Sequence, residues 1–136
     1  MTKLEKITKI KEFLDEAKVF YFVTVDGDKP RARPISFNMI ENGELYFGVG
    51  TFKEVYEQLQ KNNNLEIVAN TPSTWLRLDC KAVFDNDQHL VDKCFEIMPG
   101  IANLYKKNGW DMGIFHLENV HAEFKQVINL KETIEW

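Results

Sequence analysis

The dipeptide Asn42-Gly43 constrains the fold of this chain more than any other short segment. Asn-Gly favours the positive-φ backbone of a two-residue hairpin turn, and here it lies between two stretches rich in strand-forming residues, 31–40 and 45–49. The pattern therefore predicts an antiparallel hairpin in which Glu41 pairs with Glu44. Because a slip of one residue would exchange the two faces of a strand, the turn also predicts which side chains share a face.

The rest of the chain alternates strand patterns with amphipathic helix patterns. β-Branched or aromatic runs and period-2 alternation predict strands, and helical periodicity with capping residues predicts helices. The further strands are expected at 19–25, 65–69, 74–84, 112–118 and 120–129, and the helices at 2–17, 51–61, 86–98 and 101–107. Short connections favour antiparallel neighbours. The sequence thus predicts a single α+β domain over residues 1–136, mainly β, with a six- to seven-stranded antiparallel barrel and flanking helices.

Composition and charge argue against several classes of partner. The 136 residues are 44% hydrophobic and 28% charged, as in ordinary globular proteins, and the net charge is −4. An acidic chain has no general attraction to nucleic acid or to an acidic membrane surface. No apolar run approaches the roughly 20 residues of a membrane-spanning helix, and the charged N-terminus has no apolar core like that of a signal peptide. We therefore expect neither nucleic acid nor a membrane as a partner.

The cysteines and histidines indicate no metal site. Cys80 and Cys94 are too few for a disulfide framework or a zinc site, so we expect reduced, buried packing residues and a cytoplasmic location. His89, His116 and His121 do not have the spacing of metal ligands. The expected metal content is none.

Basic and hydroxyl side chains converge on the start of the helix predicted at 51–61. The hairpin register places Arg33 opposite Phe52, beside Thr51 and Lys53, and Thr51 has capping-box spacing to an acidic residue three positions later. Because a helix start offers free N–H groups and positive potential, this cluster predicts a site for a phosphate monoester. The preceding glycines leave room for a ligand. Two simpler interpretations stay open: Thr51 only caps the helix, and Lys53 lies in solvent.

The order of these features resembles a known family. An arginine-bearing strand, the Asn-Gly hairpin, a Gly-Thr-Phe-Lys corner, a helix and a tryptophan-bearing strand follow one another within residues 13–84, over half of the chain. This order is similar to the pyridoxamine 5′-phosphate oxidase-like family of flavin-binding split barrels, especially its short nitroimidazole-reductase-like and general-stress-like members. The resemblance implies an FMN-binding split β-barrel and a homodimer with FMN in clefts at the subunit interface.

The resemblance also implies a set of cofactor-binding residues. They are Arg33, Pro34, Ile35, Ser36, Phe47, Gly48, Thr51, Lys53, Gln58, Trp75 and Arg77. Arg33, Thr51 and Lys53 match the positions that hold the FMN phosphate. The segments 34–36 and 47–48 match the strands that cradle the isoalloxazine ring.

The remaining positions match less closely. Gln58 resembles a helix glutamine found near the flavin, and Trp75 and Arg77 match residues supplied by the second subunit. Trp110 is a further candidate for a residue that closes over the cleft. Position 79 is Asp where relatives often have glycine, and the chain shows no arginine-rich C-terminal substrate segment. The resemblance therefore does not imply a true pyridoxamine 5′-phosphate oxidase.

The function implied by the resemblance is that of a flavin-dependent oxidoreductase. Bound FMN would carry the redox chemistry and reduce a small conjugated molecule, so no catalytic acid or base is required of the protein. One alternative is a flavin-binding sensor or carrier without catalysis. Another is the same fold with the deazaflavin F420 or haem in place of FMN.

Overall fold

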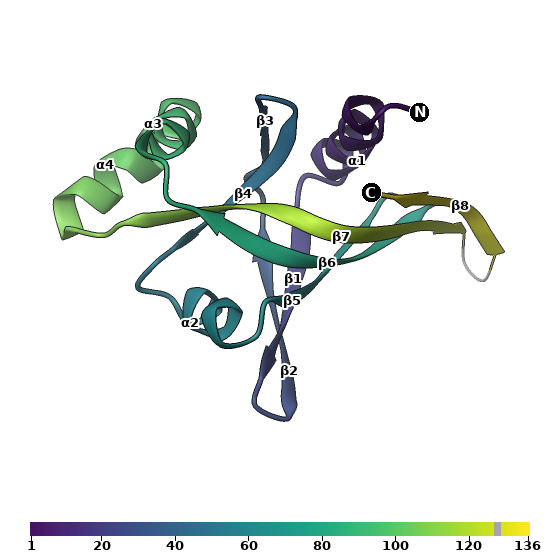
Figure 1. Ribbon diagram of the computed structural model, residues 1–136, viewed down its shortest axis with the longest axis horizontal. Coiled ribbons are helices and arrows are strands. Elements are labelled where there is room, and N and C mark those ends of the chain that lie inside the picture. The colour runs from purple at the N-terminus through teal and green to yellow at the C-terminus, as the bar shows by residue number, and fades with distance from the viewer. Residues whose placement is uncertain (127–128) are drawn as a thin grey trace.

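The computed structural model describes residues 1–126 and 129–136, which form four helices and one antiparallel sheet of eight strands (Figure 1). The helices are α1 (Lys3–Ala17), α2 (Glu54–Lys61), α3 (Gln88–Ile97) and α4 (Pro99–Asn108). The strands are β1 (Phe20–Asp26), β2 (Lys29–Ile35), β3 (Met39–Glu41), β4 (Glu44–Gly50), β5 (Asn64–Asn70), β6 (Trp75–Asp85), β7 (Met112–Gln126) and β8 (Asn129–Glu135). This architecture confirms the predicted α+β, mainly β, fold class, but the described residues form eight strands rather than the predicted six to seven.

The sheet is open rather than closed. Its strand order is β2-β1-β5-β6-β7-β4-β3, and β8 pairs with β7 beside this path. The two ends of the order, β2 and β3, are consecutive in the chain but do not pair with each other in the described residues. No helix in this part of the chain is long and apolar enough to cross a membrane.

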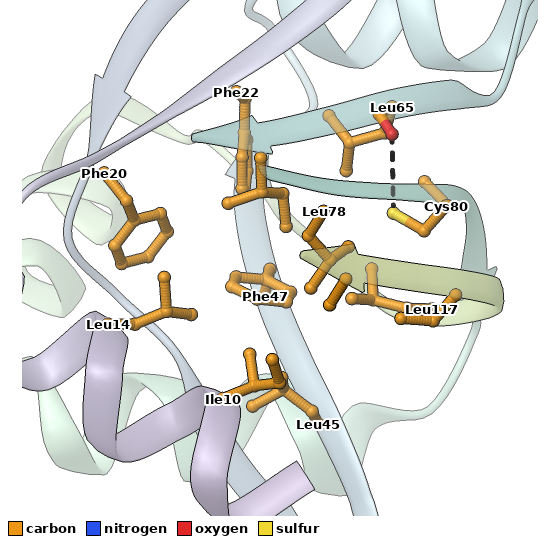
Figure 2. Packing of buried hydrophobic residues seen from close by; sticks show 14 of the residues in the cluster. Ile10, Leu14, Phe20, Phe22, Leu45, Phe47, Leu65, Leu78, Cys80 and Leu117 are labelled. Atoms are coloured by element: carbon orange, nitrogen blue, oxygen red, sulfur yellow. Dashed lines mark hydrogen bonds between the residues drawn. The ribbon is translucent and has the colours of Figure 1, made fainter. Parts of the chain in front are cut away.

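The main core lies on the inner face of the curved sheet and is rich in phenylalanine. Phe20, Phe22, Phe47 and Phe115 are fully buried, and their neighbouring ring centroids lie 5.4 to 5.9 Å apart. Figure 2 shows Phe47 among Phe20, Phe22 and Leu78, which come from other strands. These residues come from alternating positions of β1, β4 and β7, as the period-2 pattern of a half-buried strand requires.

Helix α1 packs on this core against β3, β4 and β5. Thr2 and Glu5 form the predicted capping box: the Glu5 N–H donates to the Thr2 hydroxyl and the Thr2 N–H donates to the Glu5 carboxylate, both at 3.1 Å. Ile7, Ile10 and Leu14 are fully buried along one stripe. The helix predicted at the N-terminus is therefore confirmed, together with the face it buries.

The hairpin at Asn42-Gly43 forms in the predicted register, with Glu41 opposite Glu44. Asn42 has a φ of 50° and Gly43 a φ of 75°, the positive values that the two-residue turn needs. The pairing between β3 and β4 covers three residues on each strand.

The prediction of one continuous strand over 31–40 is wrong. Residues 36–38 leave the ladder, so β2 pairs with β1 while only β3 pairs with β4. The buried Asn38 anchors this break to α1: its amide donates to the Asp15 carboxylate at 3.0 Å, and the Lys11 ammonium donates to its oxygen at 2.9 Å. Hydrogen bonds to a helix that is distant in the sequence thus replace the strand hydrogen bonds at Asn38.

The break also moves the chain from one side of the sheet to the other. Ile35 packs against the main core, whereas Phe37 and Met39 belong to a second buried cluster on the outer face. Helices α3 and α4 cover that cluster with Leu90, Cys94 and Tyr105. A continuous strand over 31–40 would place Ile35 and Phe37 on one face, because they are two positions apart, whereas the break places them on opposite faces.

The C-terminal strands also differ from the prediction. Instead of two strands at 112–118 and 120–129, β7 is a single strand, and the tail forms β8. Asn119 has a φ of 53°, and the pairing of β6 with β7 shifts by one residue nearby, which marks a β-bulge rather than the end of a strand. Residues 127–128 of the predicted last strand lie outside the described residues.

Cys80 and Cys94 are buried packing residues with free thiols, as predicted. The Cys80 thiol lies 3.6 Å from the carbonyl oxygen of Leu65 (Figure 2). Burial raises the pKa of Cys80, and it raises the pKa of Cys94 to about 12, so both side chains stay in the thiol form. Among the described residues, no three His, Cys, Asp or Glu side chains are arranged to hold a metal ion.

Candidate functional site

Arg33 lies on the inner face of β2, at the point where β1 and helix α2 meet. It pairs with Phe22, and its Nη1 donates to the Thr24 hydroxyl at 2.7 Å while its Nη2 donates to Gln58 Oε1 at 2.6 Å. Nη1 also lies 3.3 and 3.2 Å from the carbonyl oxygens of Phe22 and Arg31. The structure thus brings together two predicted site residues, Arg33 and Gln58.

The sequence predicted that the hairpin register brings Arg33 to the start of α2, and this prediction is wrong. Arg33 lies opposite Phe22 rather than opposite Phe52, because β2 separates from β4 and joins β1. Helix α2 packs against β1 as well as β4, and this packing carries Gln58 to the Arg33 guanidinium. The arginine therefore meets the helix through its middle turn.

Arg33 differs from Arg31 and Arg77 in how its charge is balanced. Arg31 and Arg77 each bond a carboxylate through Nε, at 3.0 and 2.8 Å. In the part of the chain that the structure describes, Arg33 has no carboxylate within ion-pair distance. Burial lowers the pKa of Arg33, while the charge of the nearby Glu54 acts in the opposite direction. Because arginine stays protonated in proteins, Arg33 keeps a partly buried positive charge that no direct contact neutralises.

Thr51 and Lys53 precede α2, but not in the predicted capping box. The helix begins at Glu54 with Lys53 as its N-cap, and the Thr51 hydroxyl donates instead to the carbonyl oxygen of Asp111 at 3.4 Å. The side chain of Lys53 is exposed. The amides of Glu54 and Val55 have no acceptor within residues 1–126 and 129–136, so the helix start presents two free N–H groups beside Lys53.

The glycines before this corner make room for side chains of the same chain. A Cβ on Gly50 would lie 2.6 Å from the Phe52 ring and 2.8 Å from the Tyr105 hydroxyl, and a Cβ on Gly48 would lie 3.1 Å from side chains of β7. Phe52 in turn stacks on Trp110 at a centroid distance of 4.2 Å. Internal packing therefore gives these glycines a reason that needs no ligand, and the Trp110 ring packs on Phe52.

Segments 34–36 and 47–48, which were predicted to face a flavin ring, lie along the two edges of the opening in the sheet. β2 pairs with β1, and the second half of β4 pairs with β7; among the described residues neither segment has a second partner strand. Backbone groups along both edges are thus unpaired. Pro34 and Ser36 are exposed there and Ile35 is half-buried, whereas the Phe47 side chain is fully buried in the core. Phe47 can therefore contribute only its backbone.

Trp75 and Arg77 lie on the outer face of the sheet, away from Arg33. Strands β1 and β5 separate β6 from β2, and the register aligns Pro34, Tyr21, Val68 and Arg77 in one row across the four strands. The Arg77 guanidinium lies 5.0 Å from the centre of the Trp75 ring. Within one chain these two residues do not join the Arg33 cluster.

The residue of this cluster that sequence reasoning missed is Thr24. It is 2% exposed and holds Arg33 directly. The alternation in the strand predicted at 19–25 places Thr24 on the same face as Phe20 and Phe22. A polar residue at an inward position of an otherwise apolar strand face was the available signal.

Solved structures share the fold of this chain. A NimC/NimA family protein from Clostridium acetobutylicum matches 98% of this chain and 94% of its own length, with a TM-score of 0.87 and 24% identity. A protein from the same organism related to general stress protein 26 matches with a TM-score of 0.69, 13% identity and coverage of 99% and 96%. HutZ, the haem storage protein of Vibrio cholerae, matches with a TM-score of 0.61, 16% identity and 93% coverage of both chains. At these identities the likeness is one of fold. Comparison with curated protein sequences gave no match.

The family is shown by a match over well over half of the chain. The model of the pyridoxamine 5′-phosphate oxidase family aligns with residues 7–109, from helix α1 to the end of α4. This range contains every cofactor-binding residue that the sequence predicted, and the open antiparallel sheet agrees with the solved structures of similar fold. The chain belongs to the pyridoxamine 5′-phosphate oxidase family.

Proposed function

We propose that this protein is an FMN-dependent oxidoreductase that holds the FMN phosphate between Arg33 and the start of α2. The observation that carries this proposal is the Arg33 charge, which is partly buried and has no carboxylate partner among the described residues. Lys53 and the free amides of Glu54 and Val55 add donors and positive potential at the helix start. A phosphate dianion bound there would supply the missing negative charge.

The edges of the open sheet supply the second part of the proposed site. Unpaired backbone groups of residues 34–36 and 47–48 would hydrogen-bond to the polar rim of the isoalloxazine ring. Bound FMN supplies the transfer of reducing equivalents to a small conjugated substrate. On this proposal, the residues of this chain bind and orient the cofactor and exclude water from one side of the ring, and no side chain acts as a catalytic acid.

We also propose a homodimer, in which the second subunit completes the cleft with Trp75 and Arg77. Tyr21 is 45% and Val19 is 46% exposed, and Tyr21 shares the outer face of the sheet with Pro34 and Arg77. Exposed apolar side chains such as Tyr21 and Val19 favour contact with another protein surface. Light scattering should give twice the mass of the 15.9 kDa chain. A monomer that still binds FMN tightly would contradict a two-subunit site.

An absorption spectrum of the purified protein, after FMN is added and the sample desalted, tests the cofactor. We expect a retained flavin spectrum with shifted peaks, and weaker retention of riboflavin, which lacks the phosphate. A protein that releases FMN but retains haem, with its intense Soret band, would overturn the proposal in favour of haem. That alternative has support in the fold shared with the haem storage protein HutZ.

Turnover distinguishes an oxidoreductase from a flavin-binding sensor or carrier. The holoprotein should consume NAD(P)H in the presence of a nitroaromatic or quinone acceptor. Tight FMN binding without turnover of any such pair would favour the sensor or carrier. The proposal places the protein in the cytoplasm, where the two buried cysteines remain reduced.

A further inference from the structure

We propose that Thr24 and Gln58 are positioning residues that turn Arg33 into a clamp specific for a phosphate monoester. They orient one donor edge of the guanidinium toward the ligand and leave its charge available. This inference rests on the proposed function. It assigns a role to Thr24, and it gives Gln58, which the resemblance placed near the flavin, the role of supporting the phosphate site.

The orientation of the guanidinium follows from two oxygen atoms at its end. Thr24 Oγ1 donates to Gln58 Oε1 at 2.6 Å, and these same two oxygens accept hydrogen bonds from Nη1 and Nη2 of Arg33. The Nε–H and the second hydrogen of Nη2 have no acceptor in the described part of the chain. Those two hydrogens lie on one side of the planar group and point in parallel. They are the pair of donors with which an arginine binds an oxyanion.

The charge of Arg33 is kept because its partners are neutral. Its acceptors are a hydroxyl, a side-chain amide and the backbone carbonyls of Phe22 and Arg31. A carboxylate in the place of the Gln58 amide would hold the guanidinium equally well but would cancel its charge. A neutral anchor therefore fixes the geometry and leaves the attraction to the ligand.

The anchors are buried on two different elements. Thr24 in β1 is 2% exposed and Gln58 in α2 is 7% exposed, and a buried polar group is unfavourable unless it is hydrogen-bonded. The Thr24 hydroxyl and the Gln58 side-chain oxygen hydrogen-bond to each other and to Arg33. Because Gln58 belongs to the helix that begins next to Lys53, the same contacts also set the position of Arg33 relative to the helix start.

Gln58→Glu is the decisive variant, because it retains the size and the acceptor oxygen but adds a negative charge. We expect FMN affinity to fall about tenfold or more, while riboflavin affinity changes less than about threefold. Titration of each flavin, followed by its fluorescence, gives both dissociation constants. Gln60→Glu adds the same charge at an exposed position of the same helix and should leave the ratio of the two affinities unchanged.

Thr24→Val tests orientation without a change of charge. It removes the hydroxyl at nearly constant volume, so the ratio of FMN to riboflavin affinity should fall about three- to tenfold. Thr24→Ser retains a hydroxyl and should restore the ratio. Equal losses of affinity for both flavins would show a purely structural role and overturn the inference.

Arg33→Ala separates failure of this inference from failure of the proposed function. If Arg33→Ala leaves the ratio of affinities at the wild-type value, the phosphate site itself is wrong and both proposals fail. If Arg33→Ala lowers the ratio but Gln58→Glu and Thr24→Val do not, the phosphate site stands and the positioning role is overturned. A lowered ratio in all three variants, with thermal unfolding close to wild type for Gln58→Glu, supports both.

Discussion

Replacing Phe47 by alanine should lower the free energy of unfolding by about 3–5 kcal/mol, a large part of the stability of a small domain. The side chain is fully buried, and its ring centroid lies 5.4 to 5.8 Å from those of Phe20, Phe22 and Phe115. Alanine would leave a cavity between β1, β4 and β7 that these rings cannot fill without leaving their own positions. Urea unfolding followed by far-UV circular dichroism gives the value.

Phe52→Ala is the matched control for this loss of an aromatic ring. Phe52 is 47% exposed and stacks on Trp110 at the edge of the molecule, so its removal leaves an open surface rather than a closed cavity. We expect its unfolding free energy to stay much closer to wild type. Equal losses for the two variants would mean that Phe47 is not at the centre of the core.

Replacing Arg33 by alanine should weaken FMN binding roughly ten- to a hundredfold, the loss expected for a charge-assisted hydrogen bond. Riboflavin affinity should stay nearly unchanged, because riboflavin has no phosphate for the guanidinium to bind. The two flavins are titrated under identical conditions at two salt concentrations. The FMN preference of the wild-type protein should shrink at high salt, since part of it is electrostatic.

Arg31→Ala is the control for the loss of a positive charge near the site. Arg31 lies two residues before Arg33 on the same strand, but its charge is already paired with Asp26 at 3.0 Å. We expect little change in the affinity for either flavin. Similar losses of FMN affinity in both variants would indicate general electrostatic attraction rather than a clamp at Arg33.

Local chemistry accounts for the parts of the fold that were predicted correctly. The capping box of Thr2 with Glu5 and the turn at Asn42-Gly43 depend on residues within a few positions of one another, and both form as expected. The break at residues 36–38 could not be predicted in this way. It depends on a hydrogen bond from Asn38 to a helix residue 23 positions earlier in the chain.

The same distinction between local chemistry and long-range contacts applies to the candidate site. The residue types at Arg33, Thr51 and Lys53 indicated an anion site, but the register argument that joined them was wrong for Arg33, and the capping argument was wrong for Thr51. The register argument failed because β2 pairs with β1 rather than with β4. The capping argument failed because α2 begins later than predicted, with Lys53 as its N-cap. The free amides at the start of α2 remain consistent with the predicted role of that helix.

By itself, the sequence determined the fold class, the capping box of helix α1 and the register of the hairpin, and the order of its motifs indicated the family. The fold class, the capping box and the hairpin follow from local chemistry and from periods of two and 3.6 residues, which depend on near neighbours. Only the tertiary structure decided what Arg33 touches. Its two side-chain anchors lie nine positions before it and 25 positions after it, on a different strand and on a helix. Packing of the whole core sets which residues of these elements come together. It thereby gives Arg33 neutral partners, which do not cancel its charge.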